Sequence, residues 1–213
     1  MIYNENIAKQ LAENLLQINA IKLKPQTPFT WASGWKSPIY CDNRLTLSYP
    51  LVRNLIKEQF AACLKKHFPD AQCVSGVATA GIAHGALLAD AMNLPFSYVR
   101  SAPKQHGLSN QIEGKISAGD KVVVIEDLIS TGKSSLEVVQ AIRSAGAEVL
   151  GMLAIFTYGF HNADEAFAEA NCKLITLSDY EHLIPLAIDK KYVSENDLET
   201  LMQWRKSPDT WGK

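Results

Sequence analysis

Short apolar runs alternate with amphipathic segments through the middle of the chain. The apolar runs lie at residues 73–78, 96–99, 122–126, 149–156 and 173–177. Between them, apolar side chains recur at helical spacing, in residues 81–92, 133–146 and 162–170. Nearly continuous apolar strands that alternate with helices are typical of a parallel sheet covered on both faces. The pattern therefore predicts a doubly wound α/β fold with a mostly parallel sheet.

The two ends of the chain follow other patterns. Apolar residues recur on one helical stripe through residues 1–18, and helical spacing returns through 49–67. Residues 27–44 are rich in aromatic residues, Pro and Gly, which favours short strands and turns. A last helix is expected to begin at Ser194, with Asp197 as its capping partner. The N-terminal segment fits no βαβ unit and is predicted to be an addition to the sheet.

Composition places the chain among ordinary globular proteins, and we expect a single domain over residues 1–213. The 21 Lys and Arg against 22 Asp and Glu leave a formal net charge of −1, which argues against binding to nucleic acid or to a membrane surface. No apolar run approaches the ~18 residues that cross a bilayer, and the first residues do not resemble a signal peptide. We expect a cytoplasmic protein whose four widely spaced cysteines are free thiols.

The segment VVVIEDLISTGKSS, residues 122–135, ends like a nucleotide-binding P-loop. That pattern requires a Gly five residues before the Gly-Lys pair, and Asp127 occupies this position with Glu126 before it. Two carboxylates at the mouth of the loop would repel a triphosphate. The pattern therefore excludes a P-loop NTPase.

The same segment suits a phosphorylated sugar. The amides and hydroxyls of residues 130–134 lie at the start of a helix, where they form a cradle for an anion. Glu126 and Asp127 beside the cradle can accept hydrogen bonds from a vicinal diol, and a phosphate next to a diol describes a ribose 5-phosphate. The alternative is an ordinary strand–turn–helix with a Ser or Thr cap and solvated acids. A second small-residue segment, 76–85, also opens a helix and offers amides to another anion.

A long polar connection separates Val99 from Val122. It holds more than twenty residues, and connections of this length are usually functional. Arg100, Lys104 and His106 form a cationic set that suits a pyrophosphate, because Arg binds two oxygens at once and Lys is a compact charge. His106 can also move a proton near neutral pH. The alternative is a solvated surface loop with ordinary charges.

Three motifs in order point to one family. VVVIEDLISTGKSS resembles the 5-phosphoribosyl-1-pyrophosphate (PRPP) binding motif of the type I phosphoribosyltransferases. FTWASGWKSPIYCDNR (29–44) and YVRSAPKQHGLSNQIEGKI (98–116) resemble orotate phosphoribosyltransferases. The resemblance covers residues 27–177. It implies the type I phosphoribosyltransferase fold, with a small N-terminal hood contributed mainly by about residues 1–45 and a catalytic loop at about 100–118.

The resemblance also implies the reaction. The family transfers the 5-phosphoribosyl group from PRPP to orotate, giving orotidine 5′-monophosphate and pyrophosphate in pyrimidine (UMP) biosynthesis. It implies Mg²⁺, no metal ligand from the protein, and a homodimer with active sites shared between subunits. The catalytic candidates are Lys104, His106, Glu126 and Asp127, and the orotate candidates are Ser130 and Lys36. The PRPP candidates are Arg100, Lys104, His106, Glu126, Asp127, Leu128, Ile129, Ser130, Thr131, Gly132, Lys133 and Ser134.

Four positions depart from the better-studied branch of the family. Ser101 and Ala80 replace basic residues in the catalytic loop and the pyrophosphate loop. The other two concern orotate. Ala32 replaces a Lys in the hood and Tyr158 replaces an Arg after a late strand, so the carboxylate of orotate must be held differently. Backbone amides of residues 33–36, the Ser130 hydroxyl and Lys36 are the candidates. Two other functions stay open: transfer to another base, which the hood segment argues against, and a regulatory protein with the PRPP fold, which the −1 charge argues against.

Overall fold

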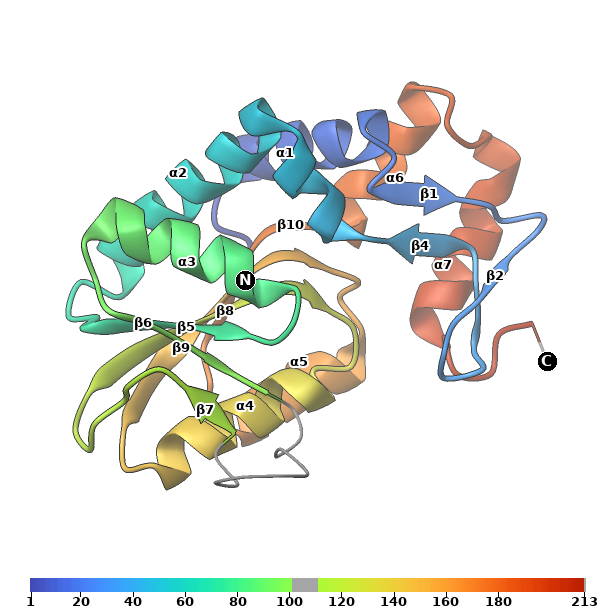
Figure 1. The fold of residues 1–213 in the computed structure, drawn as a ribbon. Helices are drawn as coiled ribbons and strands as arrows, with labels where there is room; N and C mark the ends of the chain where they lie inside the picture. The colour runs from blue at the N-terminus through green and yellow to red at the C-terminus, as the bar shows by residue number, and fades with distance from the viewer. Residues whose placement is uncertain (101–110, 213) are drawn as a thin grey trace.

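The computed structural model describes residues 1–100 and 111–212. Within this part, the chain forms a six-stranded sheet in the order β10-β9-β8-β5-β6-β7 (Figure 1). Neighbouring strands run parallel except for β6 and β7, so the predicted α/β architecture is confirmed. The strands are β5 (Cys73–Val77), β6 (Phe96–Val99), β7 (Ile112–Glu113), β8 (Lys121–Ile129), β9 (Glu148–Thr157) and β10 (Leu174–Asp179).

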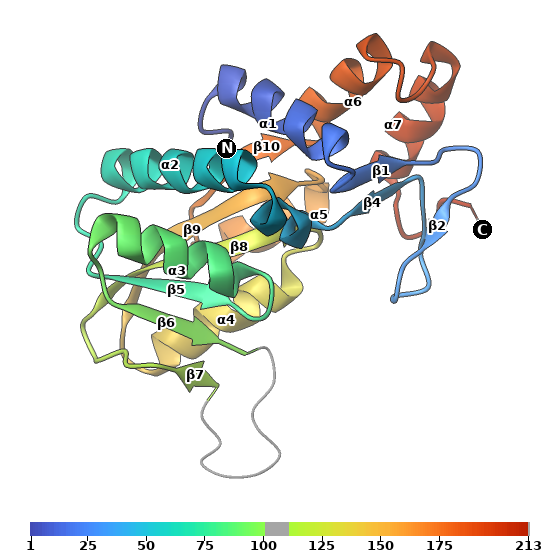
Figure 2. The ribbon, with the colours of Figure 1, turned by 45° about the horizontal axis from the view of Figure 1, so that its top comes forward.

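Helices cover both faces of the sheet, as the sequence predicts (Figures 1 and 2). One face carries α1 (Glu5–Gln17), α2 (Pro50–His67) and α3 (Gly81–Met92). The other carries α4 (Lys133–Ser144) and α5 (His161–Glu169). The central strand β8 is covered on both sides, and its residues 122–125 are fully buried. None of the helices in the described residues has the length and apolar content that a membrane crossing requires.

Two short antiparallel strand pairs form the hood. β1 (Ile21–Leu23) pairs with β4 (Ile39–Cys41), and β2 (Phe29–Thr30) pairs with β3 (Lys36–Ser37). A 3₁₀ helix, η1 (Asn43–Ser48), leads from β4 to α2. Beside the hood lie the C-terminal helices α6 (Tyr180–Asp189) and α7 (Leu198–Lys206), which the short turn η2 (Glu195–Asp197) connects (Figure 2).

Trp204 of α7 ties the hood to the C-terminal helices. Its indole is fully buried, and its Nε1 donates to the main-chain oxygen of Lys36 over 3.2 Å. Its ring meets Trp31 of the hood edge to face at 5.7 Å between centroids, and Tyr158 at 5.4 Å. Aromatic pairs in this geometry add to the stabilisation that burial alone provides. The hood hairpin is therefore held from the C-terminal end of the chain.

The observed elements extend the prediction in four places. The strand expected at 122–126 continues to Ile129, because the two acids interrupt the apolar pattern without ending the strand. The two-residue strand β7 and the helix α6, which contains Pro185, were not predicted. The expected capping pair of Ser194 and Asp197 is present, although it caps the 3₁₀ turn before α7.

His182 links α6 to α1 through two carboxylates. Its Nδ1 lies 2.7 Å from Asp179 Oδ1, and its Nε2 lies 2.6 Å from Glu5 Oε2. Only a protonated imidazole donates from both nitrogens. Partial burial lowers the pKa of His182, but the hydrogen bonds to Glu5 and Asp179 outweigh it and the net shift is upward. The protonated form is therefore favoured in the folded state.

Protonated His182 stabilises the folded state, because its pKa is higher there than in the unfolded state. This stabilisation is largest below the ordinary histidine pKa of about 6.5, and it is lost as the pH rises through the pKa of the folded state. We expect His182→Gln to lower the melting temperature by about 2–4 °C more at pH 5.5 than at pH 8.5. His161→Gln is the control, since His161 pairs with Glu165 on an exposed helix surface. Equal losses at both pH values for His182→Gln would contradict this role.

Candidate active site

The carboxyl end of β8 carries the acid pair that the sequence singles out. Glu126 is only 5% exposed, and its two oxygens accept hydrogen bonds from Ser135 Oγ (2.9 Å) and from the main-chain N–H of Asp127 (3.0 Å). Burial, followed by the charge of Asp127, raises the pKa of Glu126 well above its usual range. Glu126 is thus held from within the protein.

Asp127 is the more accessible member of the pair. Its residue is half-buried, whereas Glu126 is buried. Burial raises the pKa of Asp127, and its hydrogen bonds and the charge of Arg44 offset part of this shift. Arg44 is itself held by Asp42, at 2.7 Å from Nε to Oδ1. Since both acids shift upward, the pair binds a proton at a higher pH than isolated carboxyl groups do.

A turn after β8 leads into α4 and leaves amides available. Ser130 and Thr131 are half-buried, whereas Lys133 and Ser134 are exposed. Gly132 precedes the helix, and no side chain caps the amides of its first turn. Such uncapped N–H groups, on the positive end of a helix dipole, bind anions. The turn therefore leaves main-chain donors available at the place where the sequence predicts an anion cradle.

Gly132 fits this turn only as glycine. Its φ is +77°, and a Cβ there would lie 2.7 Å from Cε2 of Phe167. We expect Gly132→Ala to cost about 1–3 kcal/mol in unfolding free energy and to raise the KM for a phosphorylated substrate severalfold. Gly119→Ala is the matched control, because its φ is +86° but no atom lies within 4 Å of the added Cβ. Equal stability losses with an unchanged KM would contradict a special role for this turn.

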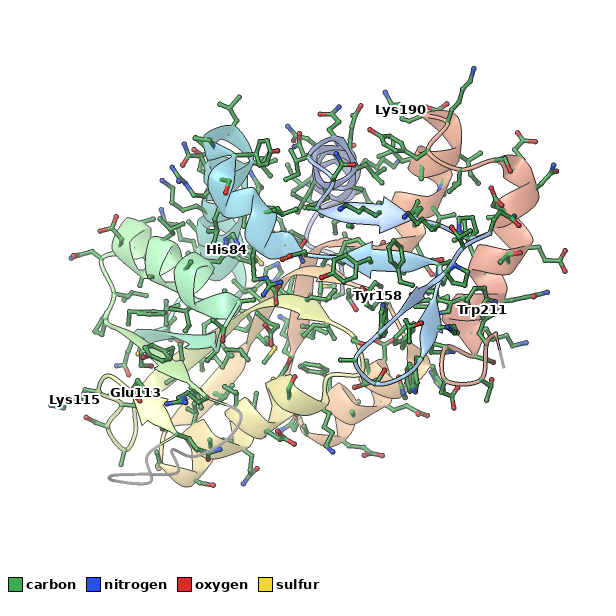
Figure 3. All side chains as sticks on the ribbon, turned by 45° about the vertical axis from the view of Figure 1, so that its right-hand side comes forward. His84, Glu113, Lys115, Tyr158, Lys190 and Trp211 are labelled. Atoms are coloured by element: carbon green, nitrogen blue, oxygen red, sulfur yellow. The ribbon has the colours of Figure 1, made fainter. Side chains whose placement is uncertain are left out.

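A cavity of about 260 Å³ lies between the hood and the end of β8. Its walls are aromatic and apolar: Thr30, Trp31, Ala32, Tyr40, Cys41, Leu128 and Tyr158. Tyr158 lies beneath the hood strands (Figure 3) and stacks on Trp31 at 5.3 Å between ring centroids. Burial raises the pKa of Tyr158 well above its usual range, so its phenol is neutral. The cavity therefore suits a flat ring.

A second cavity, of about 410 Å³, adjoins the first at Trp31 and Ala32. It is lined by hood residues and by the turn after β8: Trp31, Ala32, Ser33, Trp35, Ser130 and Thr131. The hood hairpin thus borders both cavities. The first lies beside Leu128, which follows the acid pair, and the second lies beside the turn at Ser130 and Thr131. The arrangement places a space for a ring next to a space for a phosphate.

The two orotate candidates occupy different places in this arrangement. Ser130 lines the cavity above the turn. Lys36 lies on β3, and its Nζ donates to Thr30 Oγ1 over 2.8 Å. Thr30 lines the first cavity, so Lys36 contacts one of the residues of its wall.

The PRPP candidates fall into three groups. Glu126 to Ser134 lie together along the end of β8, the turn and the start of α4; among them Ile129 is fully buried, so only its main chain can meet a ligand. Arg100 follows β6 two strands away, is exposed, and lies 4.0 Å from Glu113. Lys104 and His106 lie outside the described residues.

The loop between β5 and α3 packs tightly against the acid pair's strand. A Cβ on Gly81 would lie 2.4 Å from the main-chain oxygen of Ile125, so only glycine allows this approach. His84 of the same helix points toward η1 (Figure 3) and lies 3.2 Å from Thr46 Oγ1. Burial lowers the pKa of His84 to about 4, so it is neutral and joins the helix to the hood.

The site's residues fit a magnesium ion that arrives with its substrate. Within residues 1–100 and 111–212, no three His, Cys, Asp or Glu side chains converge where they could hold a metal. Mg²⁺ keeps an octahedral shell made largely of water and phosphate oxygens, with one or two carboxylates at most. The half-buried Asp127 carries the carboxylate that would serve as such a ligand.

Sequence reasoning missed the residues that build the cavity wall. Trp31, Tyr40 and Cys41 lie in the segment that was assigned to the hood, but no spacing rule shows which of its side chains face inward. Asn43 was also missed, and its Nδ2 donates to the main-chain oxygen of Asp127. The available signal was the density of aromatic and polar residues in 29–44, which exceeds what a short hairpin needs.

Comparison with known proteins agrees with this geometry. The family model of the phosphoribosyl transferase domain matches residues 48–190, which include the acid pair and the turn after β8. Orotate phosphoribosyltransferases from Cytophaga hutchinsonii and Listeria innocua are 54% and 55% identical over 208 residues, which is 98% of this chain and 100% of each relative. The chain belongs to the orotate phosphoribosyltransferase family.

A solved structure supports the assignment. The crystal structure of orotate phosphoribosyltransferase from Aeropyrum pernix is similar to this chain with a TM-score of 0.74 and 27% identity. The similarity covers 86% of this chain and 99% of that one. The predicted family and fold are therefore both confirmed.

Proposed function

We propose that this protein transfers the 5-phosphoribosyl group of PRPP to orotate, giving orotidine 5′-monophosphate and pyrophosphate in pyrimidine biosynthesis. The observation that carries the proposal is the junction at the end of β8, where the acid pair, the uncapped amides of α4 and an aromatic cavity meet. High identity to orotate phosphoribosyltransferases over nearly the whole chain supports the choice of orotate as the acceptor.

PRPP would lie along the end of β8. The amides and hydroxyls of residues 130–134 bind its 5-phosphate, with Lys133 adding a positive charge at the helix start. Asp127 accepts hydrogen bonds from the ribose hydroxyls, and Glu126 fixes the main chain of Asp127 from behind. Arg100, Lys104 and His106 meet the pyrophosphate. These assignments follow the predicted residues, with Asp127 rather than Glu126 facing the sugar.

Orotate would occupy the aromatic cavity. Trp31, Tyr40 and Tyr158 line this cavity, so a pyrimidine ring would make aromatic contacts there. Its carboxylate is attracted by Lys36, whose ammonium donates to Thr30 of the cavity wall, and by the hydroxyl of Ser130, which lines the adjoining cavity. Where an Arg would make a charge contact with orotate, the neutral phenol of Tyr158 would make a ring contact instead.

The chemistry follows from where charge develops. N1 of orotate loses its proton, which the leaving pyrophosphate can accept, and forms a bond to C1 of the ribose as the bond from C1 to the pyrophosphate oxygen breaks. Pyrophosphate leaves with the electron pair. Positive charge develops on the sugar, and Asp127 stabilises it through the hydroxyls it holds. Negative charge develops on the leaving group, where Arg100, Lys104 and His106 lie in the proposed arrangement. Mg²⁺, when bound, neutralises pyrophosphate charge and orients it.

Further features of the family complete the proposal. The protein acts as one domain, with a hood from residues 1–45 and a catalytic loop at about 100–118, and forms a homodimer with shared active sites in the cytoplasm. Exposed apolar side chains support the dimer: Leu51 is 87% exposed, and Leu45 and Tyr49 lie beside it in sequence. Large apolar side chains left exposed can form part of a protein contact.

The proposal is tested by offering the protein PRPP, Mg²⁺ and one base at a time. Orotate, uracil, adenine, hypoxanthine and guanine are compared by base consumption and by pyrophosphate release. We expect turnover with orotate at least a hundredfold faster than with any other base, because an aromatic cavity with a nearby cation favours a planar anion. Turnover with a purine alone would show that the acceptor is a purine and not orotate. PRPP binding without transfer to any base would favour a regulatory protein with the PRPP fold.

A further inference from the structure

Asn43 is a fully buried polar residue that joins the hood to the acid pair. It begins η1, with one residue between it and the end of β4, and none of its surface is exposed. Its Nδ2 donates to the main-chain oxygen of Asp127 over 2.7 Å, across 84 positions of sequence. Its Oδ1 accepts a hydrogen bond from the Cys41 thiol at 3.4 Å. Both polar ends of the amide are therefore used, and one of them holds the strand that carries the acids.

The main chain of Asp127 needs this partner. The pairing of β5 with β8 ends at Gly76 and Ile125, so β5 offers no hydrogen bond to Asp127. Its N–H donates instead to Glu126 Oε1, and its oxygen accepts from Asn43. A buried main-chain group requires a hydrogen-bond partner. Asn43 thus replaces the neighbouring strand at the residue where a ligand is proposed to bind.

A second set of contacts holds Asn43 in place. The Thr46 hydroxyl donates to the main-chain oxygen of Asn43 over 2.6 Å. With its hydrogen used in this way, the hydroxyl accepts from Nε2 of His84 on α3 at 3.2 Å. Asn43 therefore belongs to a turn, η1, that hydrogen bonds through Thr46 to His84 of α3.

We propose that Asn43 is a positioning residue for phosphoribosyl transfer. It touches neither the sugar nor the base; it fixes the main chain of Asp127, and so the direction of the carboxylate that stabilises the ribosyl cation. It also couples this direction to the hood, since Cys41, its other partner, lines the ring cavity. The inference rests on the proposed function and adds to it a residue through which the hood and the acid pair act together.

The test compares Asn43→Asp and Asn43→Ala with wild type in the orotate assay. Asp is isosteric and keeps an acceptor for the Cys41 thiol but loses the donor to Asp127, whereas Ala loses both. Ser178→Ala is the matched control, because the buried Ser178 hydroxyl also donates to a main-chain oxygen, that of Ala8 at 2.8 Å, and lies on β10, two strands from the acids. Circular dichroism and melting temperature show which variants are folded, and the isosteric Asp variant decides if Ala does not fold.

We expect kcat to fall by about tenfold or more in both Asn43 variants, while the KM for orotate changes by less than about threefold. Ser178→Ala keeps kcat within about twofold of wild type even where its melting temperature drops. If Asn43 acts through Asp127, the double variant Asn43→Ala with Asp127→Asn has a kcat within about twofold of Asp127→Asn alone.

Three results would overturn the inference. The first is a kcat near wild type in the folded Asn43→Asp variant. The second is a double variant in which the two losses multiply, because independent losses mean that Asn43 does not act through Asp127. The third is a wild-type protein without orotate turnover, which would overturn the proposed function and this inference with it, whereas the first two leave the proposed function intact.

Discussion

Asp127→Asn is expected to lower kcat by more than tenfold, which corresponds to at least ~1.4 kcal/mol of transition-state stabilisation. The amide keeps the size of the side chain but lacks the negative charge that balances the developing cation on the ribose. Steady-state kinetics with saturating PRPP, orotate and Mg²⁺ measure the loss directly. The exposed Asp90 on α3 provides the control, since Asp90→Asn makes the same chemical change away from the site.

The same substitution is expected to leave stability unchanged or to increase it. Burial raises the pKa of Asp127, so the folded state binds a proton more readily than the unfolded state does. At neutral pH this raised pKa opposes folding, and the opposition is absent below the unfolded-state value of about 4. Asp127→Asn removes it. A variant with lower stability at pH 7 and wild-type kcat would contradict both parts of this prediction.

Trp204→Ala is expected to lower the unfolding free energy by about 3–5 kcal/mol. The indole is fully buried, meets Phe160 at 5.2 Å between centroids as well as Trp31 and Tyr158, and donates to Lys36. Because Trp31 lines the ring cavity, its displacement also raises the KM for orotate severalfold. Urea denaturation measures the first effect, and steady-state kinetics measure the second.

Trp204→Phe separates packing from the hydrogen bond. The ring retains most of the aromatic contacts but has no donor for the oxygen of Lys36, so we expect a loss of about 1–2 kcal/mol and a smaller change in KM. If Trp204→Ala changed the KM for PRPP as strongly as that for orotate, α7 would act on the whole site rather than on the hood. That outcome would contradict the link from Trp204 to the ring cavity.

The sheet and the acid pair were predictable because each depends on local sequence. Apolar runs such as 122–125 indicate buried strands, and the acids that follow them must lie at the sheet's carboxyl edge. The turn from Ser130 to Gly132 was predictable for the same reason, since a Gly before a Ser-rich helix start is a local signal. These features need no information about which distant segments meet.

The cavity wall and its supports depend on such distant meetings. Asn43 contacts Asp127 across 84 positions, and Trp204 contacts Lys36 across 168. No periodicity in either segment specifies the other, so these pairs emerge only when the sheet and the hood are assembled. Leu51 belongs to the helical apolar spacing of residues 49–67, but the assembled chain leaves its side chain 87% exposed, because no other segment within residues 1–100 and 111–212 covers that position.

A crystal structure of the protein with PRPP and Mg²⁺ tests the central claim most directly. We expect the 5-phosphate within hydrogen-bond distance of the amides of residues 130–134 and the ribose hydroxyls against the carboxylate of Asp127. A phosphate bound elsewhere with this turn empty, or a sugar whose hydroxyls face away from Asp127, would contradict the account.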